Sequence, residues 1–311
     1  MSTWTSGSAE PGYYGAPIVK AAPWKDLIAG YFFTGGLAGG SSVLSLVARM
    51  AGNETLARRS LYVGAVADIV SPALLVSDLG RPERFLNMFR VFKVTSPMSV
   101  GSWILGVSGG ASATAALLEA AGRLKAVKLA AEVVSALSGA PLAVYTATLV
   151  SDTAIPAWHE ARKELPFLFG SSAVASAGAA AAIVVPTAEA GPARRLAVGG
   201  VLVENAVFKL MEKRLGMLGE PYSKGESGKY KQVALACTTG GAALLAGPGR
   251  KSRLAAAAGG ALVLAGEVAV RWSVFKAGFQ SARDPKYTVL PQRERQSGAS
   301  RTQPGSSEPS V

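Results

Sequence analysis

The sequence predicts an all-α membrane protein built as a bundle of eight transmembrane helices. Of its 311 residues, 49% are hydrophobic and only 17% are charged, whereas an average soluble domain has about 25% charged residues. Glycine is abundant, with 36 residues, and small side chains let helices approach closely in lipid. The apolar segments lack the alternating pattern of a membrane β-barrel.

Eight segments are long enough to cross a membrane. A hydrocarbon core of about 30 Å takes roughly 20 mostly apolar residues in a helix. Each segment has too few charges for a soluble amphipathic helix, and the connectors are short; two halves of four helices are compatible with this order. The expected spans are residues 26–48, 57–77, 98–120, 129–151, 166–187, 192–210, 232–249 and 254–275.

Residues 1–23 form a polar segment, rich in Gly and Pro, ahead of the first span. Because it lacks the basic start and short apolar core of a signal peptide, we expect the first span itself to direct insertion. Within that span, GGLAGGSS (35–42) resembles a phosphate-binding loop only superficially, since no Gly-Lys-Ser/Thr ending follows. We expect these glycines to pack closely against another helix.

The connector between the second and third spans is unusually charged and aromatic. It reads SDLGRPERFLNMFRVFKVTSPMS, residues 77–99. Gly80 permits a turn, and Pro82 suits the first turn of a helix. Phenylalanine, leucine and methionine then recur at helical spacing against arginine and lysine. This pattern is typical of a short amphipathic helix that lies in the membrane interface.

An acid and two arginines surround the turn at Gly80. We expect Asp78, Arg81 and Arg84 to form a fixed polar cluster that shapes the mouth of the bundle. Lipid phosphates or a partner protein are the alternative ligands of each arginine.

The membrane domain covers residues 24–276, and a basic tail follows at residues 277–311, for which the polar composition predicts disorder. The connectors of one face carry 11 Lys/Arg in 32 residues, and those of the opposite face carry 12 in 57. The positive-inside rule therefore places the denser face in the cytoplasm and both termini outside, although the basic tail favours the reverse. The net charge of +12 fits membrane lipid, not nucleic acid.

The residues that could hold a redox centre are few. Cys237 is the only cysteine and His159 is the only histidine. One cysteine cannot hold an iron–sulfur cluster, and one histidine cannot supply both axial ligands of a membrane haem. We expect no haem, no metal, no bound cluster and no catalytic residue in this chain. Trp158 and His159 lie in a polar connector, where surface or partner contact is expected.

Three segments carry a family resemblance. They are YFFTGGLAGGSSVL (31–44), SDLGRPERFLNMFRVFKVTSPMSVGSWIL (77–105) and YTATLVSDTAIPAWHEARKELPFLFGSSAVASAG (145–178). Together they resemble the polysulfide-reductase membrane-subunit family, also called NrfD-like. The resemblance covers the first five expected spans, and the last three spans agree with it by hydropathy and length.

The resemblance implies a function in electron transfer. Members are eight-helix, haem-free subunits of bacterial or archaeal cell membranes. They exchange electrons between the quinone pool, menaquinone or ubiquinone, and an iron–sulfur subunit that serves a molybdopterin-type catalytic subunit. A tyrosine in a Y-T-x-x-L context is expected to touch the quinone head group, and Tyr145 matches it. We expect Asp78, Arg81 and Arg84 to complete the quinone-binding site at the mouth of the bundle. Some relatives have a histidine early in the first span, where this chain has only Trp24, Lys25 and Asp26. From depth alone, Tyr145 could equally be an interfacial aromatic.

Four acids lie inside the expected spans, where an ionisable side chain is costly and suggests a function. At about 1.5 Å rise per residue, three of them lie roughly 10–15 Å from the face that carries the 77–99 connector, and the fourth lies toward the opposite face. We expect them to carry protons from the quinone site. Structural pairing is the alternative, as between Glu267 and Arg271 at i,i+4 spacing. The four acids are Asp68, Glu204, Glu267 and Glu132.

The sequence is compatible with three functions. The first is a quinone-reactive subunit of a respiratory oxidoreductase. The second is a secondary transporter, suggested by eight spans, buried acids and many glycines. The third is a structural anchor that tethers a partner without handling quinone. The three family-like segments favour the first over the second, and the cost of Asp68 and Glu204 in lipid favours it over the third.

Overall fold

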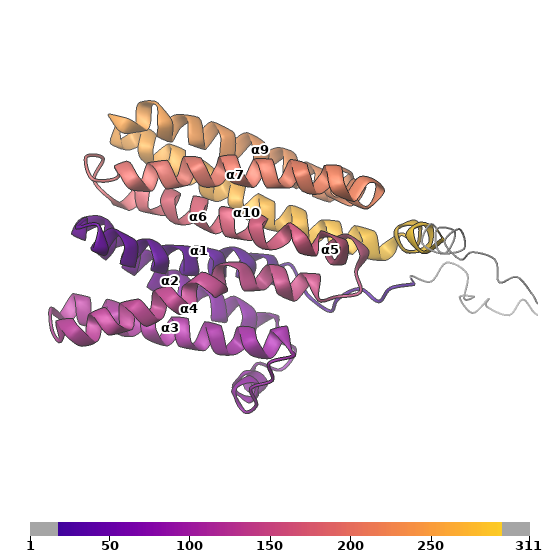
Figure 1. Cartoon of the computed structure of the whole chain (residues 1–311), viewed down its shortest axis with the longest axis horizontal. Coiled ribbons are helices and arrows are strands. Elements are labelled where there is room, and N and C mark those ends of the chain that lie inside the picture. Colours follow the sequence, from indigo (N-terminus) through magenta and orange to yellow (C-terminus); the bar gives the residue numbers. More distant parts are fainter. Residues whose placement is uncertain (1–17, 294–311) are drawn as a thin grey trace, which may run out of the picture.

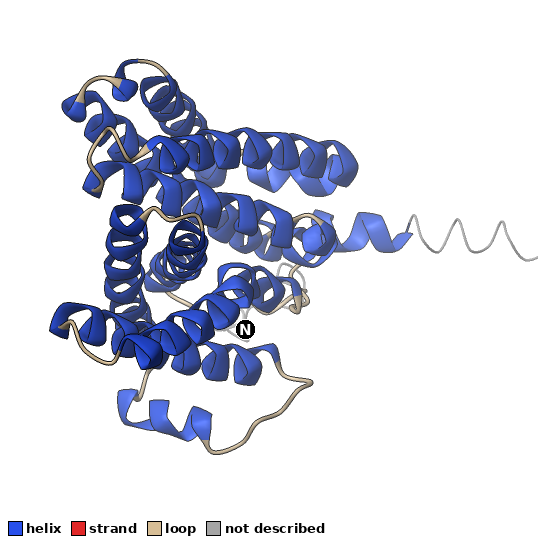
Figure 2. Cartoon of the chain, turned by 60° about the vertical axis from the view of Figure 1, so that its left-hand side comes forward, coloured by secondary structure: helices blue, strands red, loops and turns tan. Residues whose placement is uncertain are grey.

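The computed structural model describes residues 18–293, and helices joined by loops make up this range (Figure 2). Eight long helices follow the eight apolar segments in order. They are α1 (Leu27–Met50), α2 (Glu54–Asp78), α3 (Pro97–Ala121), α4 (Lys125–Ser151), α6 (Leu165–Val184), α7 (Gly191–Leu215), α9 (Gly225–Ala246) and α10 (Arg253–Arg283).

The molecule is an α-helical membrane protein. Among the described residues, six of the long helices are long and apolar enough to cross a membrane, and α7 and α9 fall short of that criterion. Charged residues explain the shortfall: α7 carries Arg194 and Arg195 in its first turns, and α9 carries Lys229 and Lys231. The apolar part of each is therefore shorter than the helix itself.

The long helices form two groups of four (Figure 1). Helices α1 to α4 lie together in the lower part of the view, and α6, α7, α9 and α10 lie in the upper part. Helix α1 joins the groups, because it packs against α2 and α4 on one side and against α6 and α10 on the other. This agrees with the four-plus-four order that the sequence allows.

Glycines let the central helices touch backbone to backbone. A Cβ placed on Gly39 would lie only 2.2 Å from the carbonyl oxygen of Gly139 on α4, and one on Gly40 would lie 2.6 Å from that of Ala173 on α6. No side chain fits at these positions. The close packing predicted for residues 35–42 is confirmed.

Short helices connect the long ones. The segment after Gly80 forms the 3-10 helix η1 (Pro82–Phe89), where the sequence predicts a short amphipathic helix. Phe89 packs edge-on against Trp103 of α3, with ring centroids 5.7 Å apart, so η1 is held against the bundle. The other short elements are α5 (Pro156–Glu160), η2 (Ala161–Lys163), η3 (Gly216–Gly219), α8 (Glu220–Ser223) and η4 (Pro248–Arg250).

The C-terminal boundary differs from the expected one. Helix α10 continues past residue 276 to Arg283, and residues 286–293 are also helical. The extension is ordered because Gly278 and Ser281 pack against α5, where Ser281 Oγ accepts a hydrogen bond from the backbone nitrogen of Ala157 at 3.2 Å. The disorder expected for the rest of the tail concerns residues 294–311, which lie outside the described residues, as do residues 1–17.

Candidate functional site

A cavity of 620 Å³ opens at the end of the bundle that carries Asp78, between α3, α4 and the α5–η2 connector. Its volume lies in the usual range for small-molecule sites, about 300–1,000 Å³. Its deeper wall is apolar, formed by residues such as Val100, Ile104 and Val144, with Pro141 of α4 beside them. The volume and lining suit a small, mostly apolar molecule.

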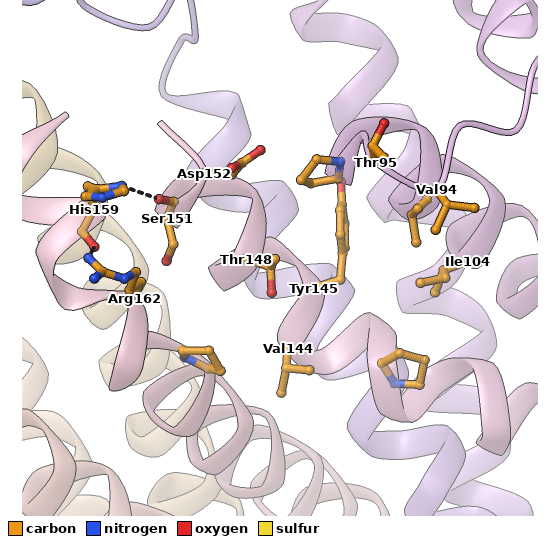
Figure 3. A pocket seen from close by; sticks show the side chains of 14 residues that line it. Val94, Thr95, Ile104, Val144, Tyr145, Thr148, Ser151, Asp152, His159 and Arg162 are labelled. Carbon is orange, nitrogen blue, oxygen red and sulfur yellow. Dashed lines mark hydrogen bonds between the residues drawn. The ribbon is translucent and has the colours of Figure 1, made fainter. Parts of the chain in front are cut away.

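Tyr145 of α4 lines this cavity (Figure 3). Its side chain is 8% exposed, and the Tyr31 hydroxyl of α1 donates a hydrogen bond to its oxygen at 3.1 Å. With Tyr31 as the donor, Tyr145 keeps its own O–H for an acceptor in the cavity. The ring lies directly on Gly101 of α3, where an added Cβ would sit 1.9 Å from a ring carbon. The structure thus places this sequence-predicted residue on a cavity wall.

Polar side chains line the mouth of the cavity (Figure 3). His159 of α5 faces Ser151, whose carbonyl oxygen lies 3.3 Å from its Nδ1. Arg162 donates to the carbonyl oxygen of His159 at 3.1 Å, and Asp152 stands nearby on the rim. His159 is exposed, as the sequence predicts, but the sequence does not predict that His159 and Arg162 line a cavity. Their connector looks like an ordinary polar loop, and no sequence pattern marks either residue.

The turn residues Asp78, Arg81 and Arg84 lie at the same end of the bundle but are not part of the cavity wall. Asp78 Oδ1 accepts a hydrogen bond from the backbone nitrogen of Lys25 at 3.2 Å. Arg81 and Arg84 are exposed, and neither forms an ion pair among the described residues. The structure therefore fixes Asp78 to the segment before α1 and leaves both arginines facing outward.

The position of Trp158 differs from the one expected from the sequence. The sequence places it at the surface, but its side chain is fully buried. The indole Nε1 donates to the carbonyl oxygen of Val274 on α10 at 2.7 Å, and the ring stacks on Trp24 at 5.7 Å. Gly278 makes the space, because a Cβ there would lie 1.9 Å from the indole. Trp158 thus anchors α5, and with it His159, to α10.

Asp68 of α2 is buried against α3, with 2% of its surface exposed. Ser112 donates a hydrogen bond to its Oδ2 at 2.7 Å, and Ser108 lies 3.3 Å from the same oxygen. Two hydroxyls from a neighbouring helix therefore solvate this carboxyl group within the bundle.

Glu204 of α7 and Glu267 of α10 meet inside the second group of helices. Their carboxyl groups lie close together, away from water. Ser172 of α6 donates to Glu267. One oxygen of each acid is buried without a protein partner in the described part of the chain.

Arg271 lies beside these two acids, but the alternative of an i,i+4 ion pair with Glu267 is not seen, since no contact within 4.0 Å joins them in the range described. Its guanidinium carbon instead lies 3.7 Å from the ring centroid of Phe169, and Nη2 donates to the Phe169 carbonyl oxygen at 3.1 Å. It also reaches α1, where a Cβ on Gly36 would lie 3.1 Å from Nη2. Arg271 therefore sits where the two groups of helices meet.

Glu132 lies at the opposite end of α4 and is fully paired. Arg49 of α1 binds it through Nε at 2.7 Å, and Ser45 Oγ lies 2.6 Å from its other oxygen. Arg49 also contacts Glu54 and Glu119. The four acids thus fall into three separate groups: Asp68, the Glu204–Glu267 pair, and Glu132.

The sequence of the chain matches a known protein family. The family model described as "Polysulphide reductase, NrfD" matches residues 18–218, well over half of the chain. The chain belongs to the NrfD polysulphide reductase family. The family predicted from the sequence segments is confirmed. Its members are membrane subunits of quinone-interacting reductase complexes, which in general also contain iron–sulfur and molybdopterin subunits.

The NrfD match covers every residue that lines the Tyr145 cavity, together with Asp68, Glu132 and Glu204. It ends before α9, so Glu267 and Arg271 of α10 lie outside it. A search among curated proteins finds no match for the chain.

Proposed function

We propose that this NrfD-family protein binds a quinone or quinol, menaquinone or ubiquinone, in the Tyr145 cavity. It then exchanges electrons with an iron–sulfur subunit docked at the same end of the bundle, which serves a molybdopterin-type catalytic subunit. The observation that carries the proposal is the 620 Å³ cavity, which combines an apolar wall with the Tyr145 hydroxyl. A quinone ring fits the apolar wall, and its carbonyl oxygen can accept from Tyr145.

Quinol oxidation releases two electrons and two protons, and the redox step belongs to the quinone itself. The chain would contribute positioning and proton acceptors. Tyr145 would orient one quinone oxygen, and His159, Asp152 and Arg162 at the mouth would receive or stabilise charge near the other. Asp78, Arg81 and Arg84 lie outside the cavity wall, so their position supports partner contact, the alternative role, more than contact with the quinone.

We further propose that protons move through the buried acids. Asp68 contacts serine hydroxyls within the bundle, and Glu204 and Glu267 lie together beside Arg271. Groups that exchange protons inside a membrane have this character. Glu132 has a complete set of partners around Arg49, so its geometry supports the structural alternative more strongly.

We propose that all eight long helices cross a bacterial or archaeal cell membrane, including α7 and α9. At 25 and 22 residues, both exceed the roughly 20 residues that a hydrocarbon core requires. Their charged ends would lie at the two membrane surfaces. The interfacial position of η1 at one of these surfaces follows from the same arrangement.

Tyr145→Phe tests the proposal in the assembled complex. Loss of one hydrogen bond of about 1 kcal/mol predicts roughly fivefold slower quinol turnover at limiting quinol, with the complex still assembled. Tyr62→Phe is the matched control, because Tyr62 lies on α2 away from the cavity. Equal rates in the Tyr145→Phe variant and the native protein would contradict quinone contact.

A second measurement separates the proposal from a purely structural anchor or a transporter. The gently solubilised protein should carry an iron–sulfur protein with it, and extraction of the bound lipid should yield quinone. A preparation that contains neither, and that fails to oxidise or reduce an added quinone analogue, argues for one of the other two functions.

A further inference from the structure

A second cavity lies at the opposite end of the bundle from Tyr145. It has a volume of 560 Å³ and lies between α7, the end of α9 and η4. Three arginines form its polar part, Arg194 and Arg195 from α7 and Arg250 from η4. Below them its wall is apolar, with Val198 and Leu202 following Arg195 along one face of α7.

The three arginines repel one another. Arg194 is close enough to Arg195 and Arg250 to feel both of their charges, and it is partly shielded from water. Its Nη1 donates to the carbonyl oxygen of Thr187 at 2.8 Å, which holds the guanidinium in place but does not neutralise it. Within the described range, no carboxylate forms an ion pair with any of the three.

Most acids at this end of the bundle bind other cations, and Glu189, which precedes α7, neither lines the cavity nor forms an ion pair in the described range. Arg49 binds Glu54 and Glu132, and Lys128 binds Glu119 at 2.6 Å. The four connectors at this end contain eleven Lys/Arg and only two Asp/Glu. The three arginines of the cavity therefore have no carboxylate partner among the described residues, and their charge is available to an anionic ligand.

We propose that this cavity binds an anionic phospholipid. Its phosphate would lie on Arg194, Arg195 and Arg250, and one acyl chain would run along Val198 and Leu202 of α7. Arginine holds phosphate oxygens through paired N–H donors, and basic pockets between membrane helices bind anionic head groups. Leu202 is 65% exposed, as a residue that faces lipid should be. A free phosphate would use the arginines but not the apolar wall.

The test uses the full chain in detergent. Native mass spectrometry would measure binding of phosphatidylglycerol, of phosphatidylcholine with the same acyl chains, and of inorganic phosphate. We expect phosphatidylglycerol to bind at least tenfold more tightly than either of the other two. Since each basic residue near an anionic lipid contributes roughly fivefold in affinity, the double variant Arg195→Gln/Arg250→Gln should lose about 25-fold.

Arg58→Gln is the control variant, because Arg58 is exposed at the same end of the bundle and lies outside the cavity. It should bind phosphatidylglycerol as the native protein does. Equal affinity of the native protein for the two lipids would overturn the proposal, and this measurement does not depend on how any variant folds. Binding of inorganic phosphate as tightly as phosphatidylglycerol would overturn the assignment to a lipid. The outcome is independent of quinone turnover at the other end of the molecule.

Discussion

At the scale of single residues, Asp68 is the clearest candidate for proton handling. Its carboxyl group is buried and contacts hydroxyls of Ser108 and Ser112, with no cation among its described partners. Asp68→Asn keeps the size and the hydrogen bonds but cannot release a proton. We expect quinol turnover to continue and proton uptake per electron to fall, measured with a pH-sensitive dye in vesicles that contain the whole complex.

Ser112→Ala serves as the control, because it removes one hydrogen bond to Asp68 and leaves the titratable group. Proton uptake per electron in this variant should stay near the native value, because the Asp68 carboxyl group can still take up and release a proton. Unchanged proton uptake in Asp68→Asn at a normal rate of turnover would remove this residue from any proton route.

The roles and contacts of some single residues could be predicted from the sequence, and those of others could not. Tyr145 could be selected because its Y-T-x-x-L context resembles the family, and the structure places it in a cavity. His159 could not, since its connector looks like an ordinary polar loop. The burial of Trp158 depends on Gly278 of α10, and Arg271 binds Phe169 of α6 instead of its neighbour on the same helix. Each of these contacts depends on which helices become neighbours. The hydrophobic periodicity of the sequence does not specify those neighbours.

At the scale of helices, the cavity depends on how closely α3 approaches α4. Gly101 has no side chain, and the Tyr145 ring occupies that space, so a methyl group there would overlap the ring at 1.9 Å. Gly101→Ala should therefore push Tyr145 out of position or separate the two helices. We expect about a tenfold loss of quinol turnover, together with weaker retention of bound quinone during purification.

Gly110→Ala on the same helix is the matched control, because nothing lies within 4 Å of its added Cβ. That variant should be neutral or slightly stabilising, since alanine favours a helix by up to about 1 kcal/mol over glycine. If both variants behave alike, the Gly101–Tyr145 contact does not set the shape of the site.

Helix positions could be predicted better than helix ends. All eight apolar segments contain a long helix, because each must satisfy its backbone hydrogen bonds internally. The last one extends to Arg283 through contacts with α5 that no local pattern announces. Similarly, Glu132 could be recognised as a buried acid, but its pairing with Arg49 joins α1 to α4 and became visible only in three dimensions.

At the scale of the whole molecule, the two ends of the bundle have different chemistry. The end with Tyr145 carries a mostly apolar cavity, and the opposite end carries the arginine cavity and the denser positive charge. The positive-inside rule assigns the second end to the cytoplasm. The proposed iron–sulfur partner would then dock on the outer side, beside α5 and α8. These two short helices are joined by a hydrogen bond from Tyr222 of α8 to the carbonyl oxygen of Ala157 of α5, at 3.0 Å.

Cysteine labelling can test both this orientation and the crossing of α9. The helix has 22 residues, or about 33 Å at 1.5 Å per residue, and Lys224 and Lys251 are exposed beyond its two ends. With the native Cys237 replaced by alanine, single cysteines at these positions should react differently with a membrane-impermeant maleimide on intact cells. We expect Lys224→Cys to be labelled at once, and Lys251→Cys only after the cells are opened. Labelling of both from outside would show that α9 does not cross, and labelling of Lys251→Cys alone would reverse the orientation and move the docking side for the partner to the cytoplasm.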